Sequence, residues 1–205
     1  MKQLKDIIQE KLTIGFKTKV NQYHYHPKDK NELKEILKER LKRDKNADLN
    51  DIDVSEITNM IDLFYHLDPH NIDISLWDVS NVKSMKSMFY GCKDFNSDLS
   101  KWDVGNVEDM RCMLYRCGKF NSDLSRWGVG NVEDMGYMFC NCKNFNSDLS
   151  QWDVTNVKRM EGMFWDCKKF NYDLLNWNVK NVKDMGHMFD GCKSLKNTPS
   201  WYKDK

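Results

Sequence analysis

Apolar and polar positions follow one pattern that recurs every 25 residues along most of the chain. In the copy that begins at Phe95, apolar and polar residues first alternate over five positions, as in a short half-buried strand. Apolar residues then recur at steps of three and four from Val107 to Cys117, which predicts one face of a helix about three turns long. We therefore expect each copy to form a short strand, a turn that contains tryptophan, a short helix and a tight return.

The period never slips, and tryptophan and cysteine each keep one fixed place in every copy. The tryptophans are Trp77, Trp102, Trp127, Trp152 and Trp177, and the cysteines are Cys92, Cys117, Cys142, Cys167 and Cys192. A fixed period between about 20 and 50 residues is typical of stacked repeat architectures. Stacking would bury the apolar residues of neighbouring copies in one continuous core.

Two local signals accompany the predicted helix. Asn106 and its equivalents stand just before it, where an asparagine side chain can accept hydrogen bonds from the first turn. Where the helix must end, a left-handed backbone is expected at one position. That position holds Gly91, Asn141, Asp166 and Gly191.

The repeated motif FNxDLSxWDVxNVxxMxxMF resembles the repeat of the BspA-type bacterial surface proteins, an irregular branch of the leucine-rich-repeat class. The match extends over roughly residues 47–201. The resemblance implies an α/β fold, a right-handed leucine-rich-repeat-like solenoid with one short strand and one short helix per coil. It also implies a non-enzymatic scaffold for protein–protein interaction, of the kind used in bacterial surface adhesion, without naming a ligand.

The chain divides into four parts. Residues 1–44 are an N-terminal extension, whose amphipathic segment 29–44 predicts a helical cap over the first coil; alternatively, its basic outer face docks an acidic partner. Residues 45–69 align as a degenerate first repeat, residues 70–194 hold five 25-residue repeats, and residues 195–205 are a partial repeat. Pro199 is expected to blunt the last exposed edge, because proline cannot donate to a ladder.

Charge and hydropathy narrow the expected partners and location. The formal net charge is +1 and no basic face dominates the repeats, so we expect no nucleic-acid partner. No apolar run reaches about 18 residues, so we expect no membrane span. The N-terminus lacks the pattern of a secretory signal, and seven cysteines fit reduced thiols, which favours the cytoplasm. The family resemblance implies the cell surface as the alternative.

Three polar columns run through the repeats. The first, Asp73, Asp98, Asp123, Asp148 and Asp173, either binds a cation or accepts hydrogen bonds from backbone or indole N–H groups, and recurrence in every copy favours the second. The adjoining column, Asn71, Asn96, Asn121, Asn146 and Asn171, is assigned to a structural ladder. The cysteine column lacks the paired spacing of zinc sites and predicts buried thiols. His24 and His26 lack identifiable partner ligands, so we expect no metal and no cofactor.

Positions that vary between matching copies are expected to be exposed and to carry binding. On the strand side these are Ser97, Lys101, Ser122, Arg126, Ser147, Gln151, Tyr172 and Asn176. Tyr172 and Arg126 are the best anchors by residue type. An aromatic strip on the helix side is the alternative, with packing between helices as its structural explanation: Tyr90, Tyr115, Cys140, Trp165 and Asp190.

No nucleophile–base pair or phosphate-binding glycine loop stands out from the repeats, so we expect no enzyme. The hypothesis is a repeat scaffold that binds an unidentified protein through its strand face. Two alternatives remain open: a cation-dependent binding module that uses the aspartate column, and a self-associating structural array.

Overall fold

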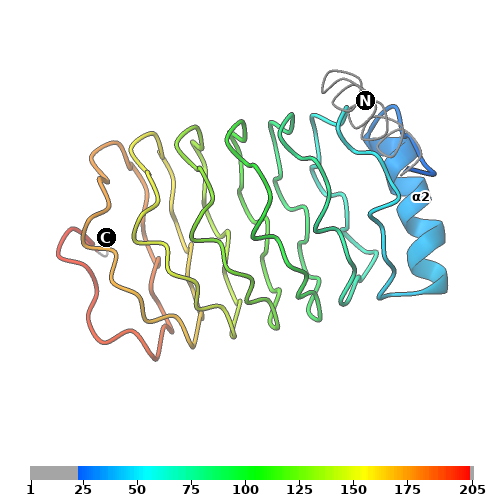
Figure 1. Cartoon of the computed structure of the whole chain (residues 1–205). Helices are drawn as coiled ribbons and strands as arrows, with labels where there is room; N and C mark the ends of the chain where they lie inside the picture. Colours follow the sequence, from blue (N-terminus) through cyan, green and yellow to red (C-terminus); the bar gives the residue numbers. More distant parts are fainter. Residues whose placement is uncertain (1–22, 204–205) are drawn as a thin grey trace, which may run out of the picture.

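The computed structural model describes residues 23–203, which form a row of stacked coils with one helix at the N-terminal end (Figure 1). We number the regular coils from 1 to 5: residues 70–94, 95–119, 120–144, 145–169 and 170–194. Helix α2, Lys30–Arg43, is the only helix in the described part, and the strand pairing there consists of isolated parallel bridges. The predicted α/β leucine-rich-repeat-like solenoid, with a strand and a helix in each coil, was therefore wrong.

Each coil is instead a succession of tight turns. The N–H of Val107 donates to the carbonyl of Val104 at 2.9 Å, and the N–H of Met113 donates to that of Met110 at 3.1 Å. A turn of this kind brings its first and fourth residues close together, and here both of them are buried. The spacing of three that predicts a helix thus also arises from consecutive turns.

Alternate N–H groups from Met110 to Arg116 bond to the next coil. Met110 donates to the carbonyl of Asp134 at 2.9 Å, and Arg116 donates to that of Cys140 at 2.7 Å. Equivalent bonds recur from coil to coil, and bridges link Asp109 to Asp134 and Asp134 to Arg159 in parallel. A helix would need the same N–H groups for carbonyls four residues earlier, so bonding between coils excludes it.

The predicted left-handed position is confirmed. Gly91 has φ of 77°, Asn141 of 62° and Gly191 of 74°. A second left-handed position, which the sequence did not reveal, holds Gly162 with φ of 55° and Tyr137 with φ of 57°. Two left-handed residues in this part of the coil turn the backbone where a helix would have continued straight.

Side chains add further bonds between coils. The indole of Trp127 donates to the carbonyl of Leu99 in the preceding coil at 2.9 Å, and the side-chain amide of Asn131 donates to that of Gly105 at 2.7 Å. Asn131 and its equivalents were predicted to cap helices, and that prediction was wrong because they bind the neighbouring coil. Trp127 also stacks on Trp152 with 6.4 Å between ring centroids.

Helix α2 covers the degenerate repeat, residues 45–69: Lys34 donates to the carbonyl of Asp62 at 2.7 Å, and Arg40 pairs with Asp51 at 2.9 Å. It begins after Asp29, whose carboxylate accepts hydrogen bonds from the N–H groups of Asn31 and Glu32 at 2.7 and 3.0 Å. One face buries Leu33, Leu37 and Leu41 in the same core as the coils. The segment for which the sequence predicts a helical cap thus closes the N-terminal end, while residues 195–203 lie on coil 5 at the other end (Figure 1).

Candidate functional site

The aspartate column closes turns within each coil. An oxygen of Asp123 accepts a hydrogen bond from the N–H of Ser125 at 2.9 Å, and Asp148 accepts one from Ser150 at 2.9 Å. The indole N–H groups bond to backbone carbonyls instead. Hydrogen bonds from Ser125 lower the pKa of Asp123, so this exposed carboxylate stays ionised at neutral pH.

The serines that precede these aspartates bind neighbouring coils together. Ser147 accepts a hydrogen bond from the N–H of Leu124 at 2.8 Å and donates one to Asp123 at 3.2 Å. Ser122 accepts one from Leu99 at 2.9 Å. The expected exposure of this column was wrong for Ser97 and Ser147, which are 5% and 6% exposed. A small hydroxyl fits between coils and satisfies a backbone donor there.

Coil 5 has Tyr172 in the serine position, and its ring is too large for that place. Tyr172 is half-buried and lines two hollows on the surface. One, about 330 Å³, lies against Ser122, Asp123, Ser147 and Asp148 of the preceding coils. The other, about 500 Å³, lies between coil 5 and residues 195–200. We call the second the Tyr172 hollow.

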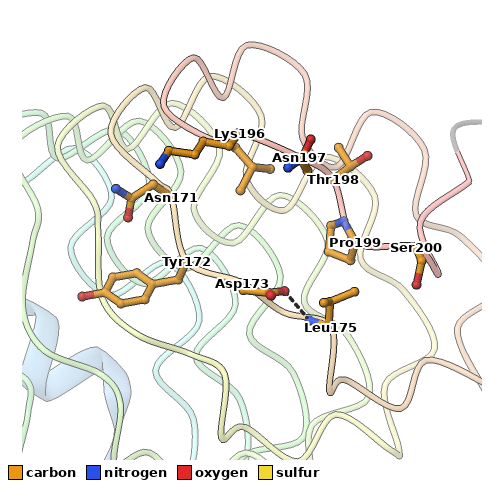
Figure 2. A pocket seen from close by; sticks show the side chains of 10 residues that line it. Asn171, Tyr172, Asp173, Leu175, Lys196, Asn197, Thr198, Pro199 and Ser200 are labelled. Carbon is orange, nitrogen blue, oxygen red and sulfur yellow. Dashed lines mark hydrogen bonds between the residues drawn. The ribbon is translucent and has the colours of Figure 1, made fainter.

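The Tyr172 hollow combines apolar and charged side chains. Figure 2 shows Tyr172, Asp173, Leu175 and Pro199 around it, and Leu195 and Lys196 also contribute to the lining. Asp173 accepts a hydrogen bond from the N–H of Leu175 at 2.8 Å, as the equivalent aspartates do in earlier coils. Leu175, where coils 1 to 4 have serine, is 52% exposed. An exposed leucine and a tyrosine beside one carboxylate and one ammonium group can hold an amphipathic protein segment.

The structure divides the predicted binding residues into three groups. The hollows bring together Ser122, Ser147 and Tyr172. Ser97 is buried, and its hydroxyl donates to the carbonyl of Ile72. The residues of the third group are exposed, and each precedes the tryptophan of its coil: Lys101, Arg126, Gln151 and Asn176. Sequence reasoning missed Leu175, Leu195 and Pro199, although the replacement of serine by Leu175 in an otherwise regular repeat was a readable signal.

The asparagine and cysteine columns lie in the hydrogen-bond network between coils. The side-chain oxygen of Asn121 accepts from the N–H of Asn146 at 2.8 Å. The thiol of Cys142 donates to the carbonyl of Leu114 at 2.9 Å, and burial raises the pKa of Cys142 and Cys167. These thiols are protonated, inaccessible groups of the core.

In residues 23–203 no group of three or more His, Cys, Asp or Glu side chains is placed to hold a metal ion. His24 and His26 each face a different carboxylate, Asp51 at 3.5 Å and Asp53 at 3.4 Å. The aspartates of the column are engaged with the backbone of their own coils.

Comparison with known proteins gives one match. A family model described as Mycoplasma protein of unknown function, DUF285, matches residues 31–140 and 122–204. No curated protein and no solved structure matches the chain. The resemblance to BspA-type leucine-rich repeats was thus wrong as an identification, because the model that matches describes a different family. Within residues 23–203, no helix has the length and apolar character to span a membrane.

Proposed function

The chain belongs to the DUF285 family, whose function is unknown, and we propose from the geometry of coil 5 that it is a non-enzymatic module that binds a segment of a partner protein. The observation that carries this proposal is the break in the repeat at Tyr172 and Leu175. In coils 2 to 4 both positions are serines: the first bonds to the preceding coil, and the N–H of the second donates to the aspartate of its own turn. In coil 5 they are large side chains that line a hollow.

The two substitutions leave apolar surface uncovered, although the Tyr172 ring packs partly against the core. Leu175 leaves half of its side chain in water, although burying such a side chain contributes about 25 cal/mol for each Å² of apolar area. Tyr172 takes the place of a serine whose equivalents bond two coils together. Exposed tyrosine and leucine side chains in a pocket are suited to a partner that covers them, because aromatic anchors dominate protein interfaces.

The lining also indicates the chemistry of the partner segment. An apolar side chain would pack against Leu175, Leu195 and Pro199. A basic group on the same segment would face Asp173, and the smaller hollow continues this preference because Asp123 and Asp148 line it. We therefore expect a segment with an apolar anchor and at least one lysine or arginine.

The test restores the regular repeat. In the double variant Tyr172→Ser/Leu175→Ser, coil 5 regains the serines of coils 2 to 4, so we expect it to keep the fold of the natural chain. Affinity capture from an extract of the native host would recover a partner with the natural chain and lose it with the double variant. The matched control is Leu76→Ser, which removes a leucine that is 53% exposed on coil 1 and should leave capture unchanged.

Three outcomes would contradict the proposal. Equal capture by the natural chain and the folded double variant would place the partner elsewhere on the surface. Recovery of the protein's own chain alone would favour the self-associating array. Loss of capture in the Leu76→Ser control as well would show that exposed leucines act nonspecifically.

A further inference from the structure

A second surface runs along the stack where each coil makes two consecutive turns. In coil 1 the N–H of Cys92 donates to the carbonyl of Phe89 at 3.0 Å, and the N–H of Phe95 donates to that of Cys92 at 3.1 Å. The residues at the tips of these turns, such as Tyr90 and Lys93, project outward while the cysteine stays buried. We call this surface the aromatic–lysine edge: residues 90–94, 115–119, 140–144, 165–169 and 190–194.

The aromatic–lysine edge is basic. It holds seven lysines and arginines against three aspartates: Lys93, Arg116, Lys119, Lys143, Lys168, Lys169 and Lys193 against Asp94, Asp166 and Asp190. Lys119 pairs with Asp94 at 2.6 Å, and Lys168 lies 4.0 Å from Asp166. Among the described residues, no carboxylate lies within ion-pair distance of the four other lysines, which are exposed. Most of the cations are thus available to a partner.

Another part of each coil carries the opposite charge. The turns in residues 71–78, 96–103, 121–128, 146–153 and 171–178 hold eight aspartates against Lys101 and Arg126. All eight aspartates are exposed. The near-neutral total charge therefore conceals two oppositely charged edges, and a negatively charged surface would attract one edge and repel the other.

Aromatic side chains accompany the lysines. Trp165 is 41% exposed, and Tyr65 extends the row at 38%. Tyr90 and Tyr115 stack with 4.6 Å between centroids, and the guanidinium of Arg116 lies 5.2 Å from the Tyr115 ring. The described part has no helices beside this row, so packing between helices does not explain it. Because Tyr90 and Tyr115 cover each other, they offer little open ring surface on which nucleic-acid bases could stack.

We propose that the aromatic–lysine edge docks on an anionic lipid surface. The edge is a row of turn tips that places basic and aromatic side chains side by side, as an anionic headgroup region would require. Tyrosine and tryptophan favour the boundary between lipid headgroups and water. Lysines near an anionic bilayer each strengthen binding about fivefold. The edge shares no residue with the Tyr172 hollow, so this inference is independent of the proposed function.

The test uses the full chain and two kinds of vesicle. At low salt the protein should co-sediment with vesicles of phosphatidylcholine that contain phosphatidylglycerol. It should not co-sediment with vesicles of phosphatidylcholine alone. Raising the salt concentration should release the protein, because screening weakens the attraction. In the variant Lys143→Glu/Lys168→Glu/Lys169→Glu/Lys193→Glu, binding should fall by about a hundredfold or more.

A matched control separates the edge from total charge. The variant Lys101→Glu/Arg126→Glu/Lys180→Glu/Lys183→Glu changes the net charge by the same amount at exposed positions outside the edge. It should retain clearly more binding than the edge variant. Equal loss in both folded variants, or equal binding to both kinds of vesicle, would overturn the proposal. Binding of a single-stranded RNA oligonucleotide through the edge, without binding to vesicles, would assign the edge to nucleic acid and also overturn it.

Discussion

Coils 2 to 4 and coil 5 have nearly the same sequence framework but use two positions differently. In coils 3 and 4, Ser122 and Ser147 accept backbone N–H groups of the preceding coil, and each aspartate closes a turn by accepting the N–H of the serine two residues later. In coil 5, Tyr172 and Leu175 take these positions, and a hollow of about 500 Å³ opens beside them. The buried framework continues through both regions, since Trp152 stacks on Trp177 and the indole of Trp177 donates to Leu149.

The difference distinguishes positions that hold the stack together from positions whose side chains vary. The recurring tryptophans, cysteines and asparagines have hydrogen-bond partners in a neighbouring coil. Tyr172 replaces a serine whose equivalents bond two coils together, whereas Leu175 keeps the turn hydrogen bond through its N–H and changes only the side chain. In coil 5 the departures are aromatic and apolar, and both line one hollow. The four predictions below test this distinction, from the largest expected effect to the smallest.

The largest effect on the free energy of unfolding is expected at the buried residues that all coils share. Trp127→Ala removes a buried ring that stacks on Trp152 and an N–H that satisfies the carbonyl of Leu99. We expect the free energy of unfolding to fall by about 3–5 kcal/mol. Trp165→Ala removes a ring that is 41% exposed and should cost less than about 1 kcal/mol. Urea denaturation of the two variants measures both values, and equal losses would refute the assignment of Trp127 to the core.

Substitution at the serine position should lower the free energy of unfolding strongly in coil 4 and only slightly in coil 5. Ser147→Ala leaves the buried N–H of Leu124 without its acceptor, so the free energy of unfolding should fall by about 1–3 kcal/mol. Tyr172→Ser should cost less than about 1 kcal/mol, because the ring is only partly buried against the core and serine is the residue of coils 2 to 4. Thermal unfolding of both variants checks this contrast. A larger loss from Tyr172→Ser than from Ser147→Ala would mean that Tyr172 is a structural residue.

The cysteine column should make stability fall at high pH. Burial raises the pKa of Cys192 from 9.0 to about 12. Between these values the unfolded thiol has lost its proton while the folded thiol keeps it, so stability falls as pH rises, by about 1.4 kcal/mol per pH unit for each thiol. Unfolding measured from pH 8 to pH 11 should give a shallower loss for Cys192→Ala than for the natural chain. Parallel curves would show that this thiol is not held protonated.

The smallest effect is expected where coil 5 keeps the common pattern. The side chains of Asn131 and Asn181 donate to carbonyls of the preceding coils, Gly105 and Thr155, both at 2.7 Å. Replacing either with alanine should lower the free energy of unfolding by about 0.5–1.5 kcal/mol. The two losses should agree, because this ladder passes unchanged from the regular coils into coil 5. A clear difference in chemical denaturation would show that coil 5 departs from the others in its framework too.

The sequence was sufficient to predict the period, the stacking and most of the core. Buried residues such as Trp127, Cys142 and Phe145 follow from position in the repeat alone. The left-handed positions at Gly91 and Asn141 were also readable, because few residue types accept that backbone conformation. These features depend only on residue type and on position in the repeat, and both can be read directly from the sequence.

The local structure of the coils could not be read from the same pattern. Apolar residues at steps of three fit both a helix and a chain of turns, and only bonding between coils decides which forms. Asn131 fits a helix cap equally well as a bond to the preceding coil. The burial of Ser97 and Ser147 could not be predicted, because serine side chains are usually exposed. At the site, Tyr172 was predicted as an anchor, whereas Leu175 was missed because its neighbours in the fold come from residues 195–200.

The central claim is that the Tyr172 hollow binds a partner protein, and site-specific photocrosslinking tests it most directly. The photoreactive amino acid p-benzoylphenylalanine would be placed at Thr198, which lines the hollow, and in a second protein at Lys101, an exposed position on coil 2. Irradiation in an extract of the native host should give one discrete product from Thr198 and none from Lys101. When the substitutions Tyr172→Ser and Leu175→Ser are introduced into the protein that carries the photoreactive residue at Thr198, that product should disappear. The same product from both positions, or from Lys101 alone, would contradict the account.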